Sequence, residues 1–377
     1  SMTKRDFLKK NITNNIYIKY NMKATLVLDN GMRFEGTAFG CEKPAVGEVV
    51  FCTAMTGYPE SLTDAAYAGQ LLVLTYPLVG NYGVPSHEVK ELGLEKFFES
   101  NKIQVRGLIV TDYSEEYSHW NAAETLDAWM KREGVPGITG IDTRALTKAL
   151  RNEGVMGGQI VIGDAQPSTV NAQPYDTVNY VAEVSCEAPV TYNEGAAKKV
   201  VLIDCGVKHS LIRSLVAHDL EVVRVPYDYD FTALNYDAVV VSAGPGNPNL
   251  YAATVGHIAK AMETAKPILG IGLGCQLMGL AAGAKVEKLK FGHHGANQPS
   301  RLTGSNSCYI TNQNAGYAVV ADSLPAGWKV LFTNMNDGAV DGIRHEEKPW
   351  IGTQFAPEAC SRGYQKDNLM DDFVKLI

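Results

Sequence analysis

The chain has 377 residues, a formal net charge of −7, and ordinary shares of hydrophobic (45%) and charged (20%) residues. This length exceeds that of most single domains, so we expect two domains with a sizeable core. The acidic balance and the lack of a Lys/Arg stripe argue against nucleic acid as a partner. No apolar run approaches the roughly 18–20 residues that span a bilayer, so we expect no membrane partner either.

The seven cysteines are scattered along the chain and contain no C-x-x-C spacing. This pattern excludes the usual zinc motifs and indicates no disulfide framework, so we expect a reducing, cytoplasmic setting. The adjacent pair His293 and His294 lies in a Gly-rich stretch, which is more typical of a loop than of a metal site. We therefore predict no bound metal.

The first half of the chain is rich in predicted strands. Residues 1–21 are basic and Asn-rich and lack the apolar core of a signal peptide, so we interpret them as an N-terminal extension of unknown role. From Met22 the stretch "ATLVLDNGMRFEGTAFG" predicts two strands around an Asn-Gly hairpin turn. Two helices follow, in "AAETLDAWMKREG" and in "DTRALTKALRNEG", with Asp142 as the N-cap of the second. This order predicts an α+β domain over residues 22–163.

The second half alternates strands and helices. Residues 164–197 are polar, contain several Pro and Asn, and show no sustained period, so we interpret them as a linker. From Lys198 to Ile377 the apolar runs alternate with helical patterns. The predicted fold class is therefore α/β, with a doubly wound, mostly parallel sheet after the α+β domain. Functional sites in such sheets lie beyond the carboxyl ends of the strands.

Two Gly-rich turns follow strands in this second half, "SAGPGNP" and "GIGLGC". Neither matches the dinucleotide-binding pattern, because "GIGLGC" has Cys275 where the last Gly belongs and follows the fourth strand of the domain. The better match is the strand-to-helix elbow that mounts a nucleophile between two flanking glycines. Gly270 and Gly274 then flank the turn, and Gly272, which has no side chain, stands at its apex. We expect Gly272 to have unusual backbone angles.

Longer motifs point to a family. They are "GEVVFCTAMTGYPESLTDAAYAGQLLVLTYPLVGNYGVP" and "GIDTRALTKALRNEG" in the first half, and "PILGIGLGCQLMGLAAGAKVEKLKFGHHGANQP", "TNQNAGYAV" and "QFAPEA" in the second. With them the chain resembles the small, glutamine-amidotransferase subunit of carbamoyl-phosphate synthetase from about Met22 to Ile377. The resemblance implies a class I glutamine amidotransferase-like second domain. It also implies a large-subunit partner in carbamoyl phosphate synthesis for arginine and pyrimidines. ATP and a divalent metal would belong to that large subunit, so we expect no cofactor in this chain.

The family's glutaminase uses a Cys-His-Glu triad, in which the cysteine attacks, the histidine is the base and the glutamate orients it. Carried over by position, the nucleophile position is Gly272 and the base position is Ala356, while Glu358 remains. Cys275 stands where the family's elbow has a histidine. It lies almost one helical turn past the apex, so neither it nor Cys360 is placed to replace the nucleophile.

Other positions of the pocket divide into altered and retained ones. Ala315 stands in place of a histidine and Ala66 in place of a serine that relatives often carry. By resemblance, the retained glutamine-binding or oxyanion positions are Gly244, Gly246, Leu273, Gln276, Asn314, Gly316 and Tyr317.

These departures favour a small-subunit homologue that has lost its glutaminase and acts as a structural or regulatory subunit of an ammonia-using synthetase. Two alternatives remain open at this point. The chain could be a stand-alone pseudoenzyme that binds glutamine or a related small molecule, or a conventional, active glutaminase subunit.

Overall fold

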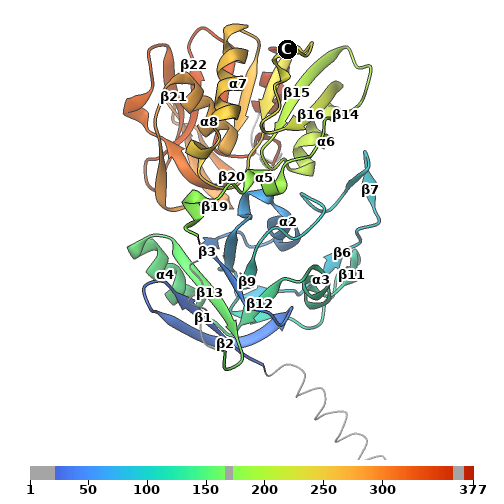
Figure 1. Ribbon diagram of the computed structural model, residues 1–377, viewed down its shortest axis with the longest axis vertical. Coiled ribbons are helices and arrows are strands. Elements are labelled where there is room, and N and C mark those ends of the chain that lie inside the picture. The colour runs from blue at the N-terminus through green and yellow to red at the C-terminus, as the bar shows by residue number, and fades with distance from the viewer. Residues whose placement is uncertain (1–21, 166–172, 360–368) are drawn as a thin grey trace, which may run out of the picture.

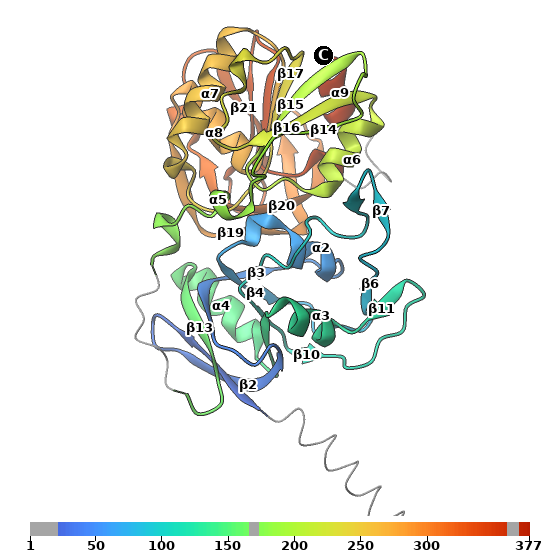
Figure 2. The same ribbon diagram turned by 45° about the vertical axis from the view of Figure 1, so that its right-hand side comes forward.

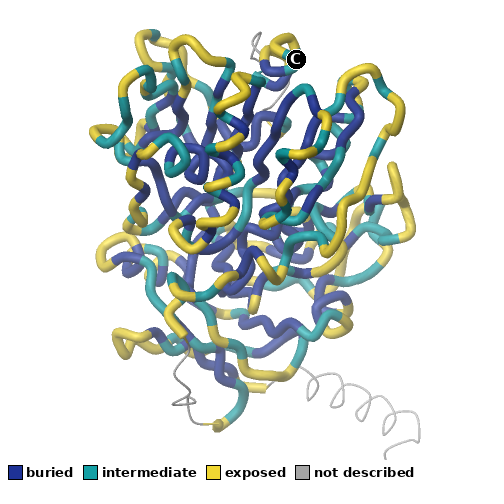
Figure 3. The backbone as a smooth tube through the Cα atoms, turned by 45° about the horizontal axis from the view of Figure 1, so that its top comes forward, coloured by how far each residue is buried: buried dark blue, intermediate teal, exposed yellow. Residues whose placement is uncertain are grey.

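The computed structural model describes residues 22–165, 173–359 and 369–377. Figure 1 shows two units, one formed by the first half of the chain and the other by the second. Buried stretches gather inside each unit, and exposed loops surround them (Figure 3). Within the described residues, no helix is both long and apolar enough to cross a membrane.

The first unit is built on a closed seven-stranded barrel, whose strand order is β1-β13-β3-β4-β9-β12-β2. Its apolar interior forms because alternate side chains of each strand point inward, where they pack with Leu146 and Leu150. The side chains between them on β3, β4 and β9 form a separate cluster with Leu126, Trp129 and Met130. The barrel strands are β1 (Lys23–Leu28), β2 (Arg33–Gly40), β3 (Ala45–Cys52), β4 (Gln70–Leu74), β9 (Gly107–Ile109), β12 (Pro136–Thr139) and β13 (Met156–Ile162).

Short elements decorate this barrel. The helical ones are α2 (Tyr58–Thr63), the 3-10 turn η1 (Ala65–Tyr67), α3 (Leu126–Glu133) and α4 (Thr143–Glu153). The short strands are β5 (Leu78–Val79), β6 (Val84–Pro85), β7 (Lys90–Glu91), β8 (Leu94–Glu95), β10 (Asp112–Tyr113) and β11 (Ala122–Glu124).

The local signals of the first half are confirmed. The strands β1 and β2 pair antiparallel around the Asn-Gly turn. The Asp142 side chain accepts a hydrogen bond from the main-chain N–H of Ala145, and α4 ends at Gly154. Closure into a barrel was not predicted, because it depends on the pairing of β2 with β12, about a hundred residues away.

The second unit is a ten-stranded mixed sheet covered by helices (Figure 2), which confirms the α/β fold class. Its parallel centre has the order β16-β15-β17-β18-β23, and antiparallel strands extend it on both sides. The parallel strands are β15 (Lys198–Asp204), β16 (Leu220–Pro226), β17 (Ala238–Val241), β18 (Ile268–Ile271) and β23 (Trp350–Thr353). The helices are α6 (His209–Ala217), α7 (Ala252–Glu263), α8 (Leu273–Ala282) and α9 (Leu369–Val374).

The antiparallel part contains two strands that the sequence did not predict, β19 (Val286–Leu302) and β22 (Val340–His345). They pair with β20 (Cys308–Val319) and β21 (Trp328–Asn334). The predicted linker is also more than a linker. Its described part contains α5 (Val181–Val184) and β14 (Val190–Tyr192), and β14 joins the sheet edge by pairing with β16.

Candidate functional site

The turn between β18 and α8 has the geometry of the predicted elbow. Gly272 has φ 54° and ψ −114°, a conformation that is essentially restricted to glycine, so the prediction of unusual angles is confirmed. The flanking glycines are sterically required. A Cβ at Gly274 would lie 2.1 Å from the carbonyl oxygen of Val241, and one at Gly270 would lie 2.5 Å from that of Gly274. The Gly272 N–H donates to the carbonyl of Thr353 at 2.7 Å, which ties the apex to β23.

Main-chain amides surround this apex. Among the described residues, the N–H groups of Leu273 and Gly244 have no hydrogen-bond partner, as an anion-accepting amide requires. Gly246 differs, because its N–H donates to the Tyr175 hydroxyl at 3.0 Å. Gly244 is held close to β15, since a Cβ there would lie 2.0 Å from the carbonyl oxygen of Cys205.

The predicted base position lies across a small cavity from the elbow. Ala356 follows β23, and its N–H donates to the carbonyl of Asn312 at 3.0 Å. The cavity has a volume of about 20 Å³, and its lining includes Ile271 beside the apex, Ala356 and Glu358. This volume holds about one water-sized molecule. The structure therefore brings the predicted base position and the remaining carboxylate to one small cavity, which Ile271, the residue before the elbow apex, also lines.

Glu358 is the titratable group of this cavity that the sequence predicted. It lies in the 3-10 turn Pro357–Ala359, and its Oε2 atom is enclosed without a hydrogen-bond partner among the described residues. Burial raises the pKa of this carboxyl to about 7, and the positive charge of Lys208 opposes that rise. A carboxylate in this position would orient a histidine at position 356 through a hydrogen bond, but the methyl group of Ala356 has no donor for such a bond.

Lys208 is a site residue that the sequence analysis missed. It lines the same cavity, and its Nζ lies 2.9 Å from Oδ2 of Asp64 in the first unit. Burial alone would lower the pKa of Lys208, but the nearby carboxylates of Asp64, Glu99 and Glu358 raise it. Lys208 therefore stays charged and joins the two units. Its signal in the sequence was its place just beyond the carboxyl end of β15, where sites of such sheets lie.

Asp64 extends this contact into a network that includes Asn314. The Asn314 amide Nδ2 donates to Oδ2 of Asp64 at 2.9 Å, and its Oδ1 lies 2.7 Å from Nδ1 of His294. Burial lowers the pKa of His294 to about 4, so this imidazole is neutral at pH 7 and donates to Asn314. The other oxygen of Asp64 accepts from the N–H of Ala66 at 3.0 Å. The altered position Ala66 thus lies at the junction of the units.

The remaining predicted positions lie on α8 and β20. The Gln276 amide is buried and donates to the carbonyl of Tyr317 at 2.9 Å and to Oε1 of Gln354 at 3.1 Å. The Tyr317 hydroxyl donates to Oδ1 of Asp176 at 2.6 Å. Ala315 is buried, whereas Gly316 has no atom near the place of a Cβ. In this structure the Gln276 side chain is therefore hydrogen-bonded to the main chain of β20, and its amide nitrogen already has two acceptors.

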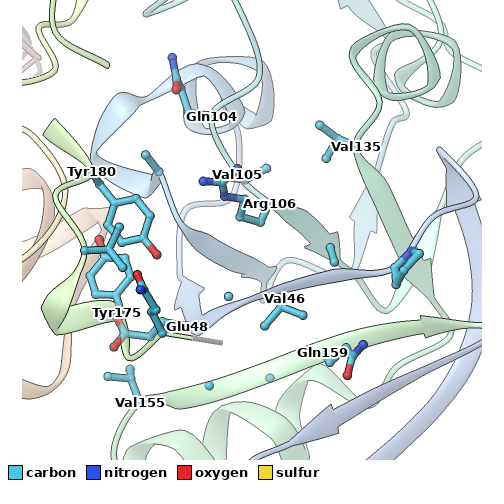
Figure 4. Close-up of a pocket in the computed structure, with 18 of the residues that line it drawn as sticks. Val46, Glu48, Gln104, Val105, Arg106, Val135, Val155, Gln159, Tyr175 and Tyr180 are labelled. Carbon is cyan, nitrogen blue, oxygen red and sulfur yellow. The ribbon is translucent and has the colours of Figure 1, made fainter. Parts of the chain in front are cut away.

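A much larger cavity, about 1110 Å³, lies between the barrel and the segment that leads into the second sheet (Figure 4). Tyr175, Tyr180 and Glu48 line one side of it, and the rings of the two tyrosines stack at 4.9 Å. Lys288 bridges Glu48 at 2.5 Å and Asp176 at 2.7 Å. Because Asp176 also accepts from Tyr317 and Tyr175 also accepts from Gly246, this wall is connected to the predicted ligand positions.

Cys275 lies in the core and away from the elbow apex. It has no exposed surface, and its Sγ fills the space where a side chain at Gly352 would begin. Burial raises the pKa of its thiol, so the nucleophilic thiolate is disfavoured. Cys360 lies outside the described residues. In the part of the chain that the structure describes, no group of His, Cys, Asp and Glu is arranged to hold a metal ion.

Comparison with known proteins agrees with these features. Residues 26–160 match the model of the carbamoyl-phosphate synthase small chain, CPSase domain, and residues 201–376 match that of class-I glutamine amidotransferase. The carbamoyl phosphate synthase small chain of Pyrococcus furiosus is 43% identical, over 94% of this chain and 98% of that protein. The chain belongs to the carbamoyl-phosphate synthase small-chain family.

Other relatives of this small chain differ in length. The arginine-specific small chain of Chaetomium globosum is 45% identical, over 94% of this chain and 78% of that protein. The human "Carbamoyl-phosphate synthase [ammonia], mitochondrial" is 43% identical over 94% of this chain, which spans only 24% of that protein. The "Multifunctional protein CAD" of Squalus acanthias is 44% identical over 93% of this chain, which spans only 16% of it. The small-chain sequence thus occurs both as a separate protein and as part of a longer one.

Proposed function

We propose that this small chain has no glutaminase activity and serves as a structural or regulatory subunit of a carbamoyl-phosphate synthase that uses free ammonia. The observation that carries the proposal is that the elbow apex is Gly272, while Ala356 stands at the predicted base position and lines the same small cavity as Glu358. Neither residue has a side chain that can attack a carbonyl or accept a proton. Loss of a triad nucleophile alone lowers kcat by roughly 10⁶-fold in a well-studied protease, and loss of the base adds little.

Two further observations support this proposal. Cys275 is a buried thiol that lies three residues after the elbow apex and packs against Gly352. Burial raises its pKa and keeps it protonated, so it does not replace the nucleophile. The human relative carries ammonia in its printed name and is 43% identical to this chain. A small-chain sequence therefore accompanies an ammonia-using synthase in at least one member of the family.

The test is a paired assay of carbamoyl phosphate formation with a purified large chain, using either glutamine or ammonium chloride as nitrogen donor. We expect synthesis with ammonium and none with glutamine. The matched variant carries Gly272→Cys and Ala356→His together, and glutamine-dependent synthesis by it would show that the rest of the pocket is competent. Glutaminase activity of the unmodified chain that Cys275→Ser abolishes would overturn the proposal.

The large cavity favours a second candidate function, a pseudoenzyme that binds a small molecule. Its wall is linked through Asp176 and Tyr175 to the predicted ligand positions Tyr317 and Gly246. A molecule bound in the cavity would therefore alter the hydrogen bonds at these positions. Calorimetric titration with glutamine and glutamate tests this candidate. Heat of binding that Tyr175→Ala removes would favour it, and no heat with either compound would count against it.

A further inference from the structure

The small cavity beside Ala356 is built mainly from hydrogen-bond acceptors and apolar groups. Three of the side chains that line it, those of Glu358, Asn312 and Gln354, carry an oxygen atom. Leu211, Ala243 and Ile271 supply apolar surface. The volume of about 20 Å³ holds one molecule of the size of water. The cavity therefore has the dimensions and the acceptors of a site for one very small ligand.

Negative charge exceeds positive charge around this cavity. The carboxylates of Asp64, Glu99 and Glu358 all act on the Lys208 ammonium group, so one cation faces three anions. The Lys208 Nζ lies 2.9 Å from Oδ2 of Asp64, and Oε2 of Glu99 accepts from the N–H of Ser210 at 3.0 Å. Asp64 and Glu99 thus have partners, and the charge of Glu358 is the one that lacks a cation.

The Glu358 carboxylate also has an unused acceptor atom. Its Oε2 is enclosed and has no hydrogen-bond partner among the described residues. An ionised carboxylate that is buried without a partner is costly, so a donor that carries positive charge is favoured beside it. Gln354 offers a second acceptor, because its Oε1 takes one hydrogen bond from Gln276 at 3.1 Å and a carbonyl oxygen can take two.

Neighbouring histidines do not supply the missing positive charge. Burial lowers the pKa of His209 and lowers that of His294 to about 4, so both imidazoles are neutral at pH 7. The ligand that these features favour is a cation of the size of water that donates hydrogen bonds and accepts none. Ammonium has this size and offers four N–H donors. An alkali ion needs a shell of oxygen atoms, which the apolar side of the cavity does not provide.

We propose that this cavity binds ammonium, with the Glu358 carboxylate as its charge partner and the side-chain oxygens of Asn312 and Gln354 as further acceptors. The inference rests on the proposed function, because a histidine at position 356 would take the place of the cation beside Glu358. Bound ammonium would add a positive charge next to the ion pair of Lys208 and Asp64, which joins the two units. The nitrogen source of the proposed synthesis would thereby stabilise the junction between the units.

The test measures the melting temperature of the full chain at pH 8 in rising ammonium chloride, with sodium chloride keeping the ionic strength constant. We expect a rise of roughly 3 °C when ammonium reaches a hundred times its dissociation constant. Potassium chloride should cause no rise, because potassium has a similar size but donates no hydrogen bond. Methylammonium chloride should cause none either, because it donates hydrogen bonds but is too large.

Two variants test the assignment to this cavity. Glu358→Gln keeps the size of the side chain and removes its charge, so the affinity for ammonium should fall roughly tenfold or more. Ala356→Val keeps the charge and fills the volume, so it should abolish the response. The matched control is Glu346→Gln, which removes a carboxylate that is half-exposed and pairs with Lys329 elsewhere on the second unit. This control should respond to ammonium like the unmodified chain.

A direct measurement uses ammonium labelled with nitrogen-15. A proton–nitrogen correlation spectrum should show a signal of enclosed ammonium, separate from that of the free cation, and Ala356→Val should remove it. Neither a rise in melting temperature nor such a signal would overturn the site, as would a response that both variants retain. An equal response to potassium would overturn the assignment to ammonium. If the site fails while the large chain still makes carbamoyl phosphate from ammonium and not from glutamine, the proposed function stands. Glutamine hydrolysis by the unmodified chain would instead overturn the proposed function, whatever the melting curves show.

Discussion

Replacing Gly272 by cysteine, the residue that the family carries at the elbow, should destabilise this protein. At φ 54° and ψ −114° a residue with a Cβ is strained by about 1–3 kcal/mol. The new Cβ would also lie 3.2 Å from the Cβ of Ala243, closer than ordinary contact, and such overpacking costs about 1–3 kcal/mol. Together we expect Gly272→Cys to lower the free energy of unfolding by about 2–6 kcal/mol.

The assay is urea denaturation followed by circular dichroism, with Gly256→Ala as the matched control. Gly256 lies within α7, has no atom within 4 Å of the place of a Cβ, and does not have a positive φ. Alanine there should raise the free energy of unfolding by up to about 1 kcal/mol, because it favours the helix. The two substitutions therefore have opposite expected signs.

If Gly272→Cys is as stable as the unmodified protein, the apex is not strained and the reasoning about the elbow is refuted. If it is destabilised as expected, the change from cysteine to glycine has relieved strain that a nucleophile at this turn imposes. The single variant should still lack glutaminase activity, because Ala356 leaves the new thiol without a base.

Three more outcomes are expected. Lys208→Met should lower the free energy of unfolding by about 3–5 kcal/mol, because it leaves Asp64 buried without its cation. In a double-mutant cycle, adding Asp64→Asn should recover part of this loss. Strictly additive effects of the two substitutions would contradict the pairing. Because the pKa of Glu358 is raised to about 7, the folded state binds more protons than the unfolded state between about pH 4.5 and 7, so stability falls as pH rises through that window. Between pH 5 and 8 the free energy of unfolding should fall by on the order of 2 kcal/mol in the unmodified protein, and Glu358→Gln should remove this fall. Identical profiles of unfolding free energy against pH for the two proteins would refute this. In the folded protein a thiol reagent at pH 8 should label the exposed Cys308 and spare the buried Cys275, as peptide mapping would check; equal labelling would place Cys275 at the surface.

Local sequence signals predicted the elements that depend on near neighbours along the chain. The Asn-Gly hairpin, the helix capped by Asp142 and the glycine elbow at Gly272 all follow from the backbone preferences of a few adjacent residues. The long strand β19 was missed because its charged and Gly-rich sequence lacks a clear period, and pairing with β20 and β21 holds it extended.

The candidate site was predictable only in part, for a similar reason. Resemblance located Gly272, Ala356 and Glu358, and the fold brings Ala356 and Glu358 to one cavity. It did not show that Lys208 and Asp64, from different units, form an ion pair beside that cavity. A pair between residues 144 positions apart in the chain leaves no local pattern, because each side chain alone looks like an ordinary surface charge.

By itself, the sequence determined the fold class, the strained elbow and the identities of Gly272 and Ala356 at two of the three positions where the resemblance places a triad. These are properties of residue identity and of backbone conformation over a few bonds. Only the tertiary structure decided the burial of Glu358, the charged state of Lys208 and the neutral state of His294. Each of these depends on which distant segments exclude water from a group, and that is set when the barrel closes and the two units pack together.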